Sequence, residues 1–356
     1  MSEKRYAVVV LLLSGVWSAL GAAAPVAVEL VEVRKIWDQA PHNAFTDMVR
    51  WNEAFYCAFR EGRGHVSTDG KIRVLESRDA DTWVSAALIS LEGYDLRDAH
   101  LSVTPDGMIW APRLMLVGGA APRKQDNQSA ATGTFVSFGT FWKGGTHWTE
   151  PQIVVEPGRW LWCVTWNKGR AYGVSYTAGK GDDRYLDLLV SDDGIHYEPH
   201  VPRLFEQGYP TEVTLRFTSD GTCYALVRRD LRGDDPSSAI LGVSQPDYKQ
   251  WQWKDLGADF NSFGGPNFIQ IPGGHWLAAG RMHDGGEHTA LCCLDVQNGT
   301  MTRLLKLPSG GDTSYPGLVW HNDTLYMSYY SSHEAKTGIY LAKLKVIADG
   351  SDKSKP

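Results

Sequence analysis

Two short stretches with a common frame decide the fold: Ser77-Arg78-Asp79-Ala80-Asp81-Thr82-Trp83 and Ser191-Asp192-Asp193-Gly194-Ile195-His196-Tyr197. Both read Ser-x-Asp and end on an aromatic residue. The stretch from Trp142 to Trp148 keeps the closing aromatic, and the stretch from Ser244 to Trp253 is a weaker echo. The closing aromatic residues recur at intervals of roughly 50 to 65 residues, which in a strand-rich chain is typical of propeller blades.

These turns have a structural explanation. An Asp side chain can accept hydrogen bonds from backbone N–H groups in its own turn, and the aromatic ring can pack beneath the turn between neighbouring blades. We therefore interpret Asp79, Asp193, Trp83 and Trp148 as structural residues.

The remaining sequence reads as short strands joined by tight turns. Asp-Gly pairs such as Asp69-Gly70 and Asp220-Gly221 precede strand-forming runs such as Thr222–Val227, which is a strong hairpin signal. No long amphipathic helix follows residue 25. We predict an all-β, six-bladed β-propeller, because a mature chain of this length holds six blades of about 55 residues.

Composition and charge exclude several classes of protein. The chain has 356 residues, of which 43% are hydrophobic and 21% charged, with 37 Gly, 17 Pro and 14 Trp. This is a globular composition, so collagen, coiled coils and polytopic membrane proteins are excluded. Lys and Arg number 35 against 41 Asp and Glu, for a net charge of −6. Without a basic excess, we expect no nucleic-acid partner.

The amino terminus has the layout of a secretory signal peptide. Lys4 and Arg5 precede an apolar run from Tyr6 to about Leu20, and small residues follow. We predict a signal peptide over residues 1–23, a single propeller domain over 24–346 and a polar tail over 347–356. The protein is then exported, periplasmic or extracellular, with no stable membrane insertion after cleavage. An uncleaved membrane anchor is the alternative, although the apolar run is shorter than the ~20 residues of a span.

The cysteines do not indicate a metal site. Their number is odd, and none has the C-x-x-C spacing of zinc ligands. We interpret Cys57, Cys163, Cys223, Cys292 and Cys293 as small buried hydrophobic residues, with one disulfide left open. We expect no metal and no cofactor.

Candidate functional residues lie at separated strand starts, where a propeller gathers its loops around the axis. The polar clusters are His42-Asn43, Arg60–His65, Arg97-Asp98, Pro210-Thr211-Glu212, Arg228-Arg229-Asp230, Arg281 with His283 and His288, and Asp312–Tyr315. Arginines on one rim suit a carboxylate substrate, because the planar guanidinium binds it bidentately. A Glu beside a Tyr hydroxyl can take its proton and make the phenol a nucleophile.

The order of these motifs resembles the sialidase (neuraminidase) superfamily of six-bladed propellers with Asp-box repeats, over nearly the whole mature chain. The resemblance implies a tyrosine nucleophile paired with a glutamate, an acid/base aspartate, and three arginines that hold the substrate carboxylate. Pro210-Thr211-Glu212 and Arg228 are similar to the family's glutamate and second arginine. Ser314-Tyr315, entering Gly317–Trp320, is similar to the nucleophile segment.

The sequence departs from the family at other positions, which makes it a divergent member. Asn43 occupies the place of the first arginine, and His288 that of the third, with Arg281 as a substitute. The acid/base falls between Arg60 and Asp69, where His65 is nearest by spacing and Asp69 second, although Asp69 also fits a simple turn.

Further substrate contacts are expected from Arg60, Arg63, Arg97 and Asp98. A local salt bridge is the alternative for Arg97 and Asp98. The cluster of Trp160, Trp162 and Trp166 fits core packing, with a sugar-stacking platform as the alternative.

The sequence therefore predicts a secreted, monomeric, retaining exo-glycosidase that acts on the non-reducing end of a glycan carrying an acidic sugar, such as a sialic acid or a related keto-acid or uronate. A tyrosine nucleophile is a known exception to the usual pair of carboxylates. Two alternatives stay open. The protein could be a non-catalytic propeller that binds glycan or protein, or a polysaccharide lyase with His65 and Tyr315 as base and acid.

Overall fold

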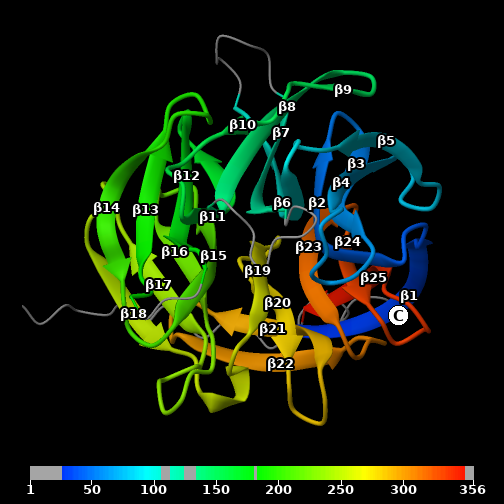
Figure 1. The fold of residues 1–356 in the computed structure, drawn as a ribbon. Helices are drawn as coiled ribbons and strands as arrows, with labels where there is room; N and C mark the ends of the chain where they lie inside the picture. The colour runs from blue at the N-terminus through cyan, green and yellow to red at the C-terminus, as the bar shows by residue number, and fades with distance from the viewer. Residues whose placement is uncertain (1–25, 106–112, 124–133, 180–182, 349–356) are drawn as a thin grey trace, which may run out of the picture.

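The computed structural model describes residues 26–105, 113–123, 134–179 and 183–348. Within these residues, 25 strands form six antiparallel sheets around a central axis (Figure 1). The one helical segment of the described chain is a single 3-10 turn, η1 (Ala258–Phe260). The prediction of an all-β, six-bladed propeller is therefore confirmed. The predicted signal peptide and most of the predicted tail lie outside the described residues.

We number the blades in the order in which their innermost strands follow one another along the chain. Blade 1 contains β2 (His42–Trp51), β3 (Ala54–Gly62), β4 (Lys71–Ser77) and β5 (Val84–Ile89). Blade 2 contains β6 (Tyr94–Val103), β7 (Leu114–Pro122), β8 (Val136–Gly144) and β10 (Gln152–Ile153), with β9 (His147–Trp148) paired to β8. Blade 3 contains β11 (Arg159–Asn167), β12 (Arg170–Thr177), β13 (Leu186–Ser191) and β14 (Glu198–Phe205).

The second half of the ring has the same organisation. Blade 4 contains β15 (Pro210–Phe217), β16 (Cys223–Arg229), β17 (Ile240–Ser244) and β18 (Trp251–Asp255). Blade 5 contains β19 (Gly264–Gln270), β20 (Trp276–Met282), β21 (His288–Asp295) and β22 (Thr300–Lys306). Blade 6 contains β23 (Thr313–His321), β24 (Thr324–Ser331) and β25 (Gly338–Ala348), and β1 (Val26–Trp37) completes it.

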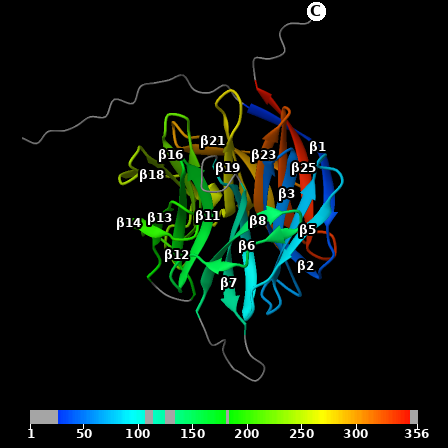
Figure 2. The ribbon, with the colours of Figure 1, turned by 90° about the horizontal axis from the view of Figure 1, so that it is seen from above.

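Blade 6 joins the two ends of the described chain. Strand β1 pairs antiparallel with β25, from Val26 opposite Ala348 to Trp37 opposite Ile339. The two strands lie side by side at the edge of the molecule in Figures 1 and 2. The amino-terminal strand therefore closes the ring, so that the last blade does not leave β25 as an open edge.

The core consists of apolar layers between neighbouring sheets. Ile72, Leu96 and Phe138 belong to one buried cluster that joins blades 1 and 2. Leu226 and Phe268 belong to another that joins blades 4 and 5. Because successive residues of a strand point to opposite faces, each blade contributes one set of side chains to each of its two neighbours.

The Ser-x-Asp turns have the hydrogen bonds expected of structural turns. The Oδ1 atom of Asp79 accepts the backbone N–H groups of Asp81 and Thr82, both at 2.8 Å. Asp193 accepts those of Ile195 and His196 at the same distance. These bonds keep the pKa of Asp79 well below its ordinary value, so the carboxylate stays ionised in its structural role.

The innermost strand of every blade has a β-bulge at the equivalent place. The pairing register shifts between Ala44 and Asp47 in β2, Arg97 and His100 in β6, Leu161 and Val164 in β11, Pro210 and Val213 in β15, Gly264 and Asn267 in β19, and Ser314 and Gly317 in β23. A bulge redirects the side chains at the extra residue. In this propeller the six bulges meet around the axis.

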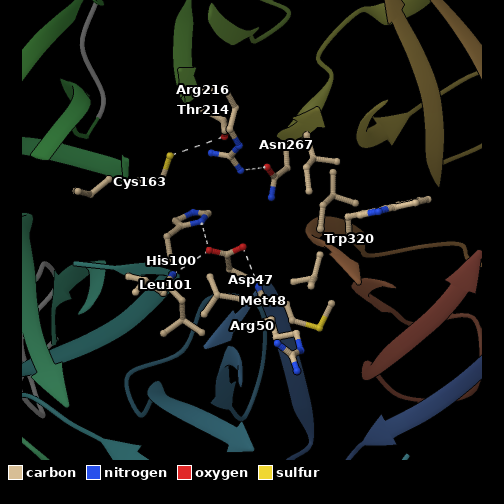
Figure 3. A pocket seen from close by; sticks show the side chains of 16 residues that line it. Asp47, Met48, Arg50, His100, Leu101, Cys163, Thr214, Arg216, Asn267 and Trp320 are labelled. Carbon is tan, nitrogen blue, oxygen red and sulfur yellow. Dashed lines mark hydrogen bonds and ion pairs between the residues drawn. The ribbon is translucent and has the colours of Figure 1, made fainter. Parts of the chain in front are cut away.

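Beyond the bulges, the inner strands enclose a polar cavity of about 330 Å³ (Figure 3). Asp47 and His100 approach each other across it, with 3.5 Å between Oδ2 and Nδ1, and Arg216 bonds to Asn267 at 2.6 Å. Asp47 also accepts the backbone N–H of Leu101 at 2.8 Å, which links blade 1 to blade 2. Hydrogen bonds between blades 1 and 2 and between blades 4 and 5 therefore hold the inner strands together around this cavity.

The five cysteines are free thiols, four of them buried and Cys293 half-buried. This agrees with their interpretation as small hydrophobic residues. No helix among the described residues has the length and apolar character needed to cross a membrane.

Candidate active site

A second cavity, of about 300 Å³, lies on the axis at the end where the inner strands begin. In the inner strands of blades 1, 2, 3, 4 and 6, the residues that line it precede those that line the cavity of Figure 3, and the inner strand of blade 5 lines only the latter. We call it the bulge pocket, because residues at the bulges form its floor. Its lining residues are Phe45, His65, Arg97, Asp98, Phe135, Trp160, Tyr176, Ala178, Gly179, Arg184, Tyr209, Thr211, Glu212, Arg228, Asp230 and Tyr315.

Tyr315 and Glu212 form a hydrogen-bonded pair at the floor of this pocket. The phenol Oη of Tyr315 donates to Oε1 of Glu212 at 2.6 Å, although the two residues lie 103 positions apart in the chain. Arg228 donates from Nη1 to the same carboxylate oxygen at 2.6 Å, and the same nitrogen lies 3.3 Å from the phenol oxygen. The three residues that match the family motifs best are therefore in contact.

The electrostatics suit a phenol that loses its proton only to a neighbour. Burial raises the pKa of Tyr315 well above 10, and the negative charge of Glu212 adds to the shift, whereas Arg228 lowers it. The phenol therefore does not ionise freely near neutral pH. It can transfer its proton to Glu212 while a new bond forms at its oxygen.

The backbone around the pair is shaped to hold it. Tyr315 has a φ of 53°, so the bulge of β23 turns its side chain toward Glu212. Gly265, in the bulge of β19, donates its N–H to Oε2 of Glu212 at 2.6 Å. A Cβ atom at Gly265 would lie 2.7 Å from the Cα atom of Tyr315, so this position has room for glycine alone.

His65 and Asp312 form a second pair at the rim. His65 lines the bulge pocket with a half-exposed ring, and its Nδ1 lies 2.7 Å from Oδ2 of Asp312. Burial tends to raise the pKa of Asp312, but hydrogen bonds from His42, His65 and Tyr330 prevail and lower it below its ordinary value. The carboxylate is therefore ionised, and it fixes the tautomer of His65 so that Nε2 is free to exchange protons.

Asp98 is the other acid of the floor. It sits at the bulge of β6 with a φ of 51° and only 8% of its surface exposed. Burial and the negative charge of Glu212 together raise the pKa of Asp98 to about 6, against the opposing effects of Arg97 and His100. The neutral carboxyl group can donate a hydrogen bond to a ligand in the slightly acidic range.

Arginines and aromatic rings form the walls. Arg97, Arg184 and Arg228 come from three different blades or their loops, and each lines the bulge pocket. Arg97 forms an ion pair with Asp95, and the guanidinium of Arg184 lies over the ring of Tyr209 at 4.4 Å. Trp160 belongs to a buried core cluster and also lines the pocket. Its position therefore agrees with core packing and also leaves part of the ring at the pocket, as a sugar-stacking residue would need.

Four other predicted site residues lie outside the pocket, because their polar groups are used within the protein. Asn43 is fully buried, and its amide donates to the carbonyls of Ala40 and Thr337. Arg60 is also fully buried and pairs with Asp95 at 2.7 Å. Arg63 and Asp69 form an exposed ion pair with 3.2 Å between their charged atoms. Of the two acid/base candidates, only His65 lines the pocket.

Arg281 lies beside the nucleophile, whereas His288 bonds within its own hairpin. Arg281 donates to the backbone carbonyl of Thr313 at 2.8 Å and to the hydroxyl of Tyr330 at 3.2 Å, and it lies 5.9 Å from the ring of Tyr315. His288 is fully buried, and its Nδ1 bonds to the carbonyl of Gly286. Neither lines the pocket, and of the two only Arg281 hydrogen-bonds to the strand that carries Tyr315.

Sequence reasoning missed Arg184, Tyr176 and Tyr209, which form one side of the pocket. They come from blade 3 and from the turn before β15, and none stands in a recognisable motif. Asp312 was noted only as a neighbour of Tyr315. Its contact with His65 spans 247 positions, a pairing that no local pattern contains.

No protein-family profile and no curated protein matches this sequence. Solved structures do match. A protein of unknown function from Dyadobacter fermentans is 19% identical, with a TM-score of 0.76 over 90% of this chain and 100% of its own. Trypanosoma rangeli sialidase is 13% identical, with a TM-score of 0.67 over 85% of this chain and 55% of its own, so the chain spans about half of that sialidase.

A GH93 α-L-arabinofuranosidase of Fusarium graminearum in complex with arabinobiose is 10% identical, with a TM-score of 0.67 over 88% of this chain and 96% of its own. These likenesses show the fold. They confirm that the chain has the propeller scaffold of sialidase-like glycosidases, and the low identities fit a divergent sequence.

Proposed function

We propose that this protein is a retaining exo-glycosidase that removes an acidic sugar, a sialic acid or a related keto-acid or uronate, from the end of a glycan. The observation that carries the proposal is the 2.6 Å hydrogen bond between Tyr315 and Glu212 at the floor of the bulge pocket. A buried Tyr–Glu pair beside an arginine is the arrangement that a neutral nucleophile needs.

In the first step, the Oη atom of Tyr315 bonds to the anomeric carbon as its proton moves to Glu212. The glycosidic C–O bond breaks, and the leaving oxygen takes a proton from Nε2 of His65, which enters this step as the imidazolium with its other proton directed at Asp312. In the second step, His65 takes a proton from water, and the water oxygen bonds to the anomeric carbon. The tyrosyl oxygen then leaves and recovers its proton from Glu212.

An acidic substrate fits both the nucleophile and the walls. A phenol approaches an anomeric centre that carries a carboxylate without the repulsion that a carboxylate nucleophile would meet. Arg228, Arg97 and Arg184 offer guanidinium groups to such a substrate. The signal-peptide layout of residues 1–23 supports action outside the cytoplasm, and we propose that the enzyme works as a monomer.

The test is release of 4-methylumbelliferone from conjugates of sialic acid, keto-deoxy-octulosonate, glucuronic acid, arabinofuranose and a neutral hexose. Wild type is compared with Tyr315→Phe and Glu212→Gln, and with Tyr326→Phe as a control in the same blade. We expect one acidic conjugate to be hydrolysed, and both pocket variants to lose at least about a thousandfold in rate.

Other outcomes decide against the proposal. Activity that survives in both variants would exclude the Tyr–Glu mechanism. Hydrolysis of the arabinofuranoside alone would exclude an acidic substrate. An unsaturated product from an acidic polysaccharide would indicate a lyase, and glycan binding with no turnover would indicate a binding propeller.

A further inference from the structure

His42, His65 and Asp312 bring three metal-ligating atoms together beside the bulge pocket. They come from the start of β2, the loop after β3 and the residue before β23. Their ligand atoms all lie within 4.8 Å of one another. Nε2 of His42 and Nδ1 of His65 both face Oδ2 of Asp312, at 2.9 and 2.7 Å. We propose that these residues bind a divalent transition-metal ion such as Zn²⁺.

The ligand chemistry is suited to such an ion. Two imidazole nitrogens and one carboxylate oxygen form a donor set that binds zinc and its neighbours, and three protein ligands leave a position for water. Among the described residues, the ion-pair partners of Asp312 are His42 and His65, which carry a positive charge only when they are protonated. A cation with a charge of +2 would compensate this carboxylate more fully than two imidazoles do.

Neighbouring side chains hold two of the three ligands in place. Tyr330 donates its hydroxyl to the other carboxylate oxygen of Asp312 at 2.9 Å, which orients the group from behind. Phe45 packs edge-on against the ring of His65, with 5.0 Å between centroids. His42 is nine-tenths buried, and its Nδ1 has no hydrogen-bond partner among the described residues, so its ring is held through Nε2.

Only a small movement would separate the atoms enough for a metal. Zinc bonds of about 2.0 to 2.2 Å in tetrahedral geometry place neighbouring ligand atoms roughly 3.4 Å apart. The two contacts with Asp312, now 2.9 and 2.7 Å, would therefore lengthen by about 0.5 and 0.7 Å. His65 lies in a loop and is half-exposed, so its ring can make this movement.

Metal binding would inhibit the hydrolase, a consequence that rests on the proposed function, whereas the site itself does not. A metal on Nδ1 of His65 occupies the lone pair of that nitrogen, so the proton of the neutral ring must move to Nε2. The ring can then neither become the imidazolium that protonates the leaving oxygen nor take a proton from water in the second step. Zinc and proton transfer compete for the same side chain.

The experiment measures metal binding directly. Protein freed of metal with a chelator is titrated with Zn²⁺ in a calorimeter and with Co²⁺ by visible absorption. We expect one ion per chain and cobalt bands of a low-coordinate nitrogen and oxygen site. Affinity should fall at least tenfold in His42→Gln, His65→Gln and Asp312→Asn. His196→Gln, which changes a surface histidine paired with Asp193, should bind as wild type does.

Because His65 is on the surface, His65→Gln tests the site even if the buried His42 variant does not fold. Stoichiometric binding that survives in His65→Gln and Asp312→Asn, or no binding by wild type, would overturn the proposal. Inhibition by zinc that is at least tenfold weaker in His42→Gln would support it further. Binding without inhibition would leave the metal site in place and count against the proposed role of His65.

Discussion

The ring of His65 stands at the rim of the bulge pocket with one nitrogen fixed by Asp312 and the other free. If His65 protonates the leaving group, replacing it should slow the reaction more when the leaving group is more basic, because such a group depends more on protonation. His65→Gln should slow hydrolysis of an alkyl glycoside by about a hundredfold or more and spare an aryl glycoside with an acidic leaving group.

The measurement is kcat/KM for both glycosides in His65→Gln and His196→Gln. The second variant breaks a similar His–Asp contact on the surface and should change neither rate. An equal loss on the two glycosides in His65→Gln would show that the ring does not act as the acid.

Asp98 makes the stability of the fold depend on pH. Burial raises its pKa to about 6 in the folded protein, above the value of about 3.9 in an unfolded chain. Between these values the folded state binds the extra proton, so the free energy of unfolding falls as the pH rises through this window and levels off above it.

Replacing Asp98 by Asn removes this dependence. From pH 4 to pH 8, the free energy of unfolding of wild type should fall by about 2 to 3 kcal/mol relative to that of Asp98→Asn. Urea unfolding of both proteins at several pH values measures the difference. A difference that stays constant across this range would contradict the raised pKa.

At the scale of elements, the bulges of the inner strands position the site. Gly265 has a φ of 63°, and a Cβ atom there would meet the Cα atom and ring of Tyr315 at 2.7 and 2.8 Å. Gly265→Ala should therefore cost about 2 kcal/mol or more in stability and, by displacing the nucleophile, roughly a hundredfold in rate.

Gly274→Ala is the matched control for this prediction. Gly274 also has a positive φ, of 83°, but no atom within 4 Å of an added Cβ, so its replacement carries the backbone cost alone. Thermal unfolding of both variants measures the cost of backbone strain, and kcat of both variants measures the effect of displacing Tyr315. Equal rates in the two variants would show that β19 does not position Tyr315.

The strands were predictable from sequence, but the bulges were not. Turn residues such as Asp220-Gly221 and the strand-forming runs beside them mark the hairpins directly. A bulge inserts one residue into a pairing that is decided by the partner strand, and the sequence of β6 or β23 alone does not record it. Asp98 was predicted from a polar cluster and Tyr315 from a family motif, whereas their placement in one pocket is visible only in the fold.

At the scale of the whole molecule, the ring is closed by strand β1. Val26 is buried, and Val28, Leu30 and Val33 are partly buried against the cluster of blade 6. Deleting Val26–Trp37 should lower the stability by roughly 4 kcal/mol or more, because this apolar area returns to water and β25 becomes an open edge.

Circular dichroism during heating measures this effect. Val31→Thr, at a position in the same strand that is 60% exposed, should stay within about 0.5 kcal/mol of wild type. Unfolding of the truncated protein at the same temperature as wild type would contradict the role of β1 as the closing strand.

The departures from the sialidase pattern have their explanation at this scale as well. The acid/base candidates lie within one loop, and spacing alone could not separate His65 from Asp69. Their partners distinguish them. His65 pairs with Asp312 of blade 6, which lies next to blade 1 once the ring is closed, whereas Asp69 pairs with Arg63 in its own loop. Asn43 was predicted as a substrate contact because it stands where the sialidase pattern has its first arginine, but its amide bonds to the carbonyls of Ala40 and Thr337.

The most direct test of the central claim is to trap the nucleophile. Wild type and Tyr315→Phe are incubated with the 2,3-difluoro analogue of the acidic sugar that is hydrolysed, and the intact proteins and their peptides are weighed by mass spectrometry. The Tyr–Glu mechanism predicts one sugar adduct, on Tyr315, and none in the variant. An adduct on Glu212 or Asp98, or one that persists in Tyr315→Phe, would contradict it.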